Sequence, residues 1–172
     1  IQDNAIIDED LKKILVSFPR SAHPMGILSS LTSALIAFNP EKKISLTKKT
    51  GDEHDYMHNL IVKLLAKIPI LVAWVYRRRN GLSLDYGDYT QGYVENVTKM
   101  MFQRPNQKYI KNDVIVNAMN KLLILHADHE QNCSTSTVRI VGSSEASLFA
   151  SVSAGISALW GRLHGGANQA VL

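Results

Sequence analysis

Three histidines in the sequence could take part in chemistry, and two of them, His126 and His129, lie close together. They end a segment whose apolar residues recur every three or four positions, which is the spacing of one face of a long helix. The apolar members of that face are Ile115, Ala118, Met119, Leu122 and Leu125. An apolar face usually excludes polar side chains unless they have partners. The pair is therefore either two hydrogen-bonded core histidines, or part of a pocket in which one imidazole donates a hydrogen bond to an anionic ligand.

A metal site is a weaker interpretation of the same pair. In zinc proteases, two histidines lie four residues apart on a helix with a glutamate between them. His126 and His129 do not have that spacing. We therefore assign no metal ligands, and a metal site stays the less favoured alternative for this pair.

The third histidine, His164, directly precedes Gly165 and Gly166 where a helix is expected to start. Glycine permits unusual backbone angles and allows a ligand to approach the chain closely. A neutral imidazole at this point could donate a hydrogen bond to a carbonyl oxygen that becomes an enolate. The alternative is an ordinary turn with an exposed histidine.

The other candidates are weaker. Arg77, Arg78 and Arg79 end a predicted helix, where cations complement the helix dipole. A solvated helix end is therefore the favoured interpretation, and a nucleotide or nucleic-acid contact has no supporting motif.

His23 directly precedes a predicted helix and could contact an anion. Cys133, the only cysteine, is interpreted as a packing residue and excludes an internal disulfide.

Helical spacing dominates the elements that must position these residues, and no strand-type alternation of useful length is present, so the predicted fold class is all-α. Pro24 is suited to the first position of a helix, and Asn39-Pro40 to its end. Asn80-Gly81 is typical of a helix end. The expected helices cover residues 24–38, 55–67, 69–79, 92–102, 115–129 and 147–160, and the expected connections cover residues 41–54 and 82–91. Small residues in the last of these helices predict burial between neighbouring helices.

The bulk properties are those of a folded soluble domain. Of 172 residues, 45% are hydrophobic and 20% are charged, and the net charge of +4 favours anionic partners without choosing among them. No targeting pattern is visible, and the most apolar stretches are shorter than the roughly 20 residues that a membrane-spanning helix needs. Both ends of the chain, Ile1 and Leu172, are interpreted as cut points.

Several motifs together resemble those of bacterial citrate synthases. The segment from Leu123 to Asn132, with its sequence LILHADHEQN, resembles a hallmark of that family, as does the following stretch from Thr135 to Ser143. The segment LHGGAN, from Leu163 to Asn168, is similar to the loop that bears a catalytic histidine. The segments AHPM from Ala22 and MMF from Met100 also match, so the resemblance covers nearly the whole chain. Arg162 is a departure, because the family pattern has proline or a small residue before this loop.

The resemblance implies part of an all-α, multi-helical large domain over residues 1–172, with the small domain absent. It implies that His164 binds the thioester oxygen of acetyl-CoA and that His129 binds oxaloacetate, with Asn132 and His126 in supporting positions. The catalytic aspartate, a further histidine and the substrate-binding arginines would lie beyond Leu172, so the chain alone is expected to be inactive.

The implied enzyme is a cytoplasmic bacterial acyltransferase of the tricarboxylic acid cycle that makes citrate. It would use acetyl-CoA as a co-substrate without a prosthetic group or metal. It would form dimers or hexamers built from dimers, and would bind neither nucleic acid nor membrane. The nearest competing hypothesis is a 2-methylcitrate synthase that uses propionyl-CoA. Two more distant hypotheses are a non-catalytic helical interaction module and a metal-dependent hydrolase built on His126 and His129.

Overall fold

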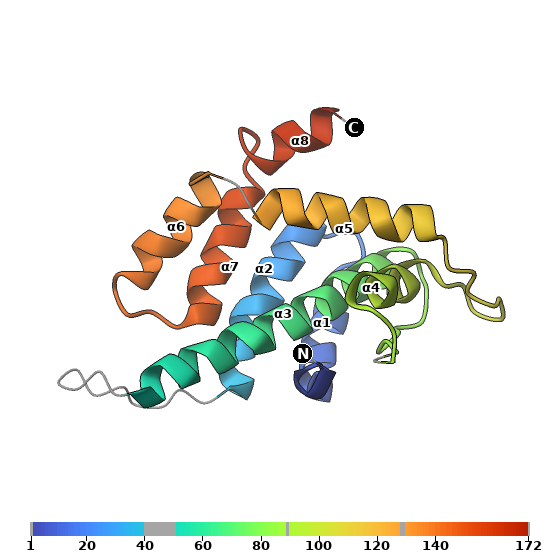
Figure 1. Cartoon of the computed structure of the whole chain (residues 1–172), viewed down its shortest axis with the longest axis horizontal. Helices are drawn as coiled ribbons and strands as arrows, with labels where there is room; N and C mark the ends of the chain where they lie inside the picture. The colour runs from blue at the N-terminus through green and yellow to red at the C-terminus, as the bar shows by residue number, and fades with distance from the viewer. Residues whose placement is uncertain (1, 40–50, 89, 128–129, 172) are drawn as a thin grey trace.

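The computed structural model describes residues 2–39, 51–88, 90–127 and 130–171, and in these ranges it contains α- and 3-10 helices but no strand (Figure 1). The elements in chain order are η1 (Gln2–Asn4), α1 (Glu9–Ser17), α2 (Pro24–Ala34), η2 (Leu35–Phe38), α3 (Gly51–Arg79), α4 (Tyr93–Phe102), α5 (Asp113–Ala127), α6 (Cys133–Gly142), α7 (Leu148–Leu159) and α8 (Gly165–Val171). The predicted all-α class is confirmed.

Helix α7 packs between α2 and α6, and α3 packs against α2 on one side and α4 on the other (Figure 1). Helix α5 contacts α4 and runs across one side of the molecule, and α8 follows the end of α7. The predicted burial of α7 between neighbours is confirmed.

The core lies where α1, α2, α3 and α7 meet. Its fully buried side chains include Leu11, Leu15, Leu31, Leu71, Trp74 and Phe149. The Trp74 indole donates its N–H to the carbonyl oxygen of Asp85 at 2.7 Å, so the loop after α3 is attached to the core. The predicted helix from Pro24 is confirmed, with Leu31 and Leu35 on its buried face.

Helix α3 continues through Pro69, so the predicted break into two helices is wrong. Proline cannot donate to the carbonyl four residues earlier, which here belongs to Leu65. The Tyr93 hydroxyl of α4 donates to that carbonyl oxygen at 2.9 Å and replaces the missing bond. The contact comes from another helix, which is why the local sequence did not reveal it. The predicted connection over residues 41–54 is also wrong at its end, because α3 begins at Gly51, and residues 41–50 lie outside the described residues.

Because α3 is continuous, the expectation that every apolar stretch is too short to span a membrane has to be revised. Residues His54–Arg79 are long and apolar enough to cross a membrane by length and composition alone. Half of the apolar window is buried inside the described structure, and Leu71 and Trp74 from it belong to the core. The core helix of a soluble protein passes the same test, so this length is weak evidence for a membrane span.

The predicted stop after α3 is confirmed. Gly81 has a φ of +69°, the left-handed conformation that glycine adopts without strain. The N–H of Leu82 donates to the carbonyl of Arg77 at 2.8 Å, and the N–H of Gly81 donates to that of Arg78 at 3.2 Å. This pair of bonds is the Schellman arrangement that satisfies the last carbonyls of a helix.

The predicted solvated arginine cluster is wrong for two of its three members. The Arg77 side chain is only 3% exposed, and its guanidinium donates to the carbonyl oxygens of Ser83, Met100 and Gln103. Arg78 donates to the carbonyls of Val16 and Phe18, and only Arg79 is exposed. A guanidinium carries several N–H donors in a fixed plane, so it can bind carbonyl oxygens from more than one segment at once. It therefore joins α3, the following loop and the end of α4.

The predicted long helix is present as α5, but the burial of its apolar face is not observed in the described structure. Leu122 and Leu125 are exposed, the latter by 65%, and Val116 is the residue of α5 that is buried. Helix α6 was not predicted at all. Its residues include several β-branched side chains, which lower helix propensity, although Asn132 is a favoured N-cap.

Replacing Arg77 by methionine should lower the free energy of unfolding of the complete protein by about 3 kcal/mol or more, because buried carbonyl acceptors lose a charged donor. Urea unfolding measures this loss. Arg79→Met is the matched control at an exposed position and should change stability by less than about 0.5 kcal/mol. Equal effects of the two substitutions would show that Arg77 does not join these segments.

Candidate active site

His164 lies in the turn that joins α7 to α8, and its ring is held by the first turn of α6. The ring Nε2 is 2.8 Å from the Ser134 hydroxyl oxygen, and the ring is half-buried. The backbone N–H of His164 donates to the carbonyl of Gly161 at 3.0 Å. Two elements far apart in sequence therefore fix one imidazole, which is what a positioned hydrogen-bond donor requires.

The glycine after His164 is needed for a reason different from the predicted one. Gly165 does not have a positive φ. A Cβ atom at this position would lie 2.3 Å from the carbonyl oxygen of Leu159, which no side chain can tolerate. A Cβ at Gly166 would lie 3.3 Å from the carbonyl oxygen of Gly161. The close approach is thus between two parts of the chain, the start of α8 and the end of α7.

Asn132 caps α6 beside this site. Its Oδ1 accepts a hydrogen bond from the N–H of Thr135 at 2.9 Å. The helix start therefore orients the side chain, whose amide nitrogen is a hydrogen-bond donor. The structure places Asn132 at the helix start whose second residue, Ser134, contacts His164.

His126 is exposed in the last turn of α5, and its Nδ1 lies 2.7 Å from the carbonyl oxygen of Leu122. A carbonyl can only accept, so the proton is on Nδ1 and the neutral ring has an acceptor at Nε2. His126 could donate from Nε2 to an anion only as an imidazolium. The second member of the predicted pair, His129, lies outside the described residues, so their pairing stays a prediction.

A groove of about 360 Å³ runs between α6 and α7 and reaches the same helix start. Its polar end is lined by Asn132, Ser134, Thr135 and Arg139, and its apolar floor by Val138, Val152, Gly155, Ile156 and Leu159. The exposed Arg139 donates to the side-chain carbonyl of Gln131 at 3.2 Å. The groove therefore contains the cation of Arg139, which belongs to α6, the helix whose first turn contacts His164.

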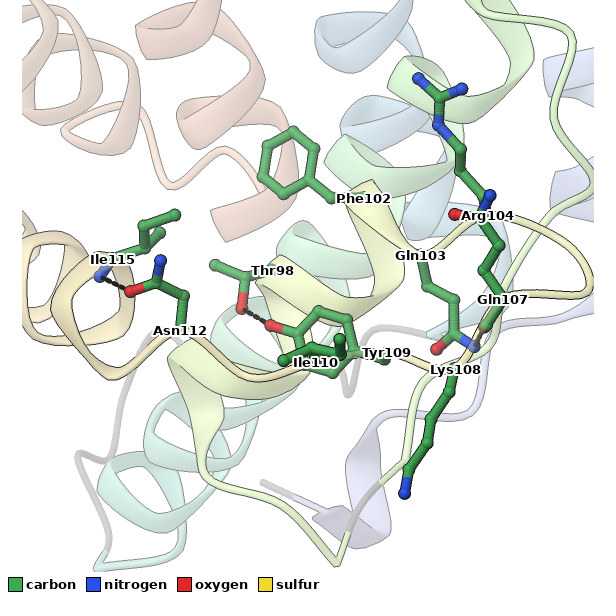
Figure 2. A pocket seen from close by; sticks show the side chains of 10 residues that line it. All are labelled: Thr98, Phe102, Gln103, Arg104, Gln107, Lys108, Tyr109, Ile110, Asn112 and Ile115. Carbon is green, nitrogen blue, oxygen red and sulfur yellow. Dashed lines mark hydrogen bonds between the residues drawn. The ribbon is translucent and has the colours of Figure 1, made fainter.

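A separate pocket of about 320 Å³ lies between the end of α4 and the start of α5 (Figure 2). Thr98 and Tyr109 share a hydrogen bond of 2.9 Å in it, and Arg104 and Lys108 belong to its lining. It contains none of the predicted site residues. Sequence reasoning missed this pocket, because its lining comes from residues around a Pro-containing loop with no chemical motif.

Among the described residues, no three His, Cys, Asp or Glu side chains come together in a way that could hold a metal ion. His129 is not among them, so this observation does not extend to the predicted pair.

Comparison with known proteins identifies the family of the chain. The family model described as citrate synthase, C-terminal domain, matches residues 1–172. The chain belongs to the citrate synthase family. It is 46% identical over its whole length to citrate synthase 1 of Mycobacterium tuberculosis, and 45% identical to the citrate synthase of Corynebacterium glutamicum. It spans only 38% of the length of each of these relatives.

The fold agrees as well. The crystal structure of citrate synthase from Pyrobaculum aerophilum superposes with a TM-score of 0.87 at 30% identity, covering 98% of this chain and 41% of that one. The enzyme from Thermotoga maritima superposes with a TM-score of 0.75 at 21% identity, which supports the fold alone. The described helices are therefore a citrate synthase fold over part of its length.

Sequence reasoning did not find Ser134, the residue that holds His164. A signal was present, because Asn132 is a strong N-cap and places Ser134 in the first turn of a helix. The contact with His164 joins residues 30 positions apart and could not be read from spacing.

Removing the Ser134 hydroxyl should release the His164 ring. In the complete protein carrying Ser134→Ala, we expect the nitrogen NMR signals of His164 to shift and broaden as the ring samples more than one tautomer and rotamer. Ser144→Ala is the matched control, because the Ser144 hydroxyl donates to the nearby carbonyl of Val141 at 2.7 Å. Unchanged His164 signals in the Ser134 variant would contradict the contact.

Proposed function

We propose that this chain is part of a citrate synthase that condenses acetyl-CoA with oxaloacetate and water to give citrate and CoA. Membership of the family and the fixed imidazole of His164 support the proposal. The observation that carries it is the bond between His164 and Ser134, because a donor aimed at a developing negative charge must be held before the reaction begins.

The hydrogen bond restricts the protonation state that this role allows. His164 must donate to the thioester oxygen while its Nε2 faces Ser134. The Ser134 hydroxyl then donates to Nε2, and the ring proton is on Nδ1. Nδ1–H is therefore the atom that we assign to the thioester oxygen as the enol forms. The reverse arrangement would leave a lone pair on Nδ1, which repels an oxyanion.

The oxaloacetate side of the proposal involves His129, Asn132 and His126. A keto acid with two carboxylates needs several donors, and Asn132 carries an amide NH₂ group at the helix start that also bears Ser134. The role of His129 follows from the resemblance alone, as do the dimers or hexamers, the cytoplasmic location and the absence of a prosthetic group.

Other parts of the reaction need residues that the resemblance places beyond this chain. These are a carboxylate base that removes the methyl proton, arginines that bind the dicarboxylate, and a domain that excludes water. Positioning of two substrates can contribute about 7 to 11 kcal/mol of the barrier. We therefore expect the 172-residue chain alone not to release CoA from acetyl-CoA and oxaloacetate.

In the complete protein, His164→Ala should lower kcat by about two to four orders of magnitude, the scale for losing a positioned donor at an oxyanion. Release of free CoA measures it. His58→Ala is the matched control, because His58 is an exposed histidine on α3. If the His164→Ala variant kept more than half of the normal kcat, His164 would not have the proposed role.

The same assay separates citrate synthase from 2-methylcitrate synthase. A citrate synthase should turn over acetyl-CoA faster than propionyl-CoA, and a 2-methylcitrate synthase should show the opposite preference. His164→Ala should reduce both rates, because both acyl groups present the same thioester oxygen.

A further inference from the structure

We propose that His23 is a positioning residue for the proposed reaction, acting through Trp160 on the turn that bears His164. Its imidazole stacks on the Trp160 indole, with ring centroids 4.7 Å apart and planes inclined by 18°. Trp160 is the C-cap residue directly after α7, and His164 follows four residues later. This inference rests on the proposed function, because it assigns His23 a part in the turnover that His164 supports.

Backbone hydrogen bonds shape the turn internally, since the N–H of Gly161 donates to the carbonyl of Ala158 at 3.0 Å and the N–H of His164 donates to that of Gly161 at 3.0 Å, but its side chains add little packing. Leu163 is 89% exposed in the described structure, and Gly161 and Arg162 are exposed as well. Its position is therefore set mainly at its two ends. Ser134 holds one end through the His164 ring, and the other end is the Trp160 indole.

The Trp160 indole packs against the start of α2. His23 covers the indole face, and a Cβ added at Gly26 would lie 3.3 Å from the indole ring, so the ring packs directly over this glycine. One turn earlier in α7, the hydroxyls of Ser157 and Ser29 lie 2.7 Å apart and join α7 to α2. Helices α2 and α7 are thus joined at Trp160 and again at Ser157, three residues before it.

His23 does two separable things. Its Nδ1 accepts a hydrogen bond from the N–H of Met25 at 3.2 Å and caps α2, while its ring face packs on Trp160. Asparagine at this position would retain a capping acceptor but lose the ring. Phenylalanine would retain a ring for stacking but lose the acceptor. The two substitutions therefore test stability and positioning independently.

In the complete protein, we expect His23→Asn to leave the melting temperature nearly unchanged and to lower kcat by about two- to tenfold, the range that an aromatic pair of this kind corresponds to. The KM for oxaloacetate should stay within about twofold, because the residues that contact oxaloacetate are unchanged. The substitution lowers only the fraction of molecules in which the turn holds His164 in its active position. His23→Phe should do the reverse, with a lower melting temperature and a kcat close to that of the parent. His58→Asn, the same substitution at an exposed histidine of α3, should change neither quantity.

The decisive comparison uses His164→Ala as the background. If His23 acts through the His164 turn, adding His23→Asn to His164→Ala should cause no further loss of the residual turnover. An equal proportional loss in both backgrounds, or a parent-like kcat in His23→Asn, would overturn the assignment. Failure of the proposed function would look different, because His164→Ala would then have no effect on condensation, or the complete protein would not condense the substrates at all.

Discussion

The close approach of α6 to α7 is the constraint on which the candidate site depends. A Cβ atom at Gly155 of α7 would lie 2.6 Å from Val138 Cγ2 and 3.5 Å from the carbonyl oxygen of Ser134, so only glycine allows the two helices this near to each other. Ser134 belongs to that same contact, and its hydroxyl meets His164 on the turn beyond α7. The distance between the helices therefore sets the distance between hydroxyl and imidazole. The polar end of the groove, with Asn132 and Arg139, is built on the same pair of helices.

The opposite face of α7 is fixed to α2 by another short contact. Ser29 bonds the hydroxyls of Ser153 and Ser157 at 3.0 and 2.7 Å, and the Ser153 hydroxyl donates back to the carbonyl of Ser29 at 2.8 Å. Small polar side chains satisfy one another here where larger ones would separate the helices. Helix α7 is thus held on two faces, which turns a helix rich in alanine, serine and glycine into a rigid support for the turn at its end. Buried Arg77 serves a comparable purpose at the far end of α3, where it joins chain segments through their carbonyls.

Sequence reasoning predicted the elements whose signals are local. Helix α2 begins at Pro24, and Gly81 lies just past the end of α3 at Arg79, and both positions are marked by a residue with a defined backbone preference. It failed where a distant partner decides the outcome. Tyr93 bonds the carbonyl left open by Pro69 in α3, and carbonyls from the loop after α3 and from the end of α4 bind the buried Arg77. Helix α6 was missed for a local reason, because its β-branched residues lower helix propensity. The histidine at the site was found because the His-Gly-Gly motif is local. Its partner Ser134 was missed because their contact depends on packing, and His129 stays a prediction outside the described residues.

A size exchange across the α6–α7 contact tests this account most directly. In the complete protein, Gly155→Ala adds a methyl group against Val138, so α6 must move and carry Ser134 away from His164. We expect kcat to fall, and a further Ser134→Ala substitution to have no added effect. Val138→Ala in the same chain removes the obstructing methyl groups and should restore both turnover and its dependence on Ser134. Normal kcat in Gly155→Ala with an undiminished effect of Ser134→Ala, or no recovery with Val138→Ala in a folded protein, would contradict the claim that this contact positions the site.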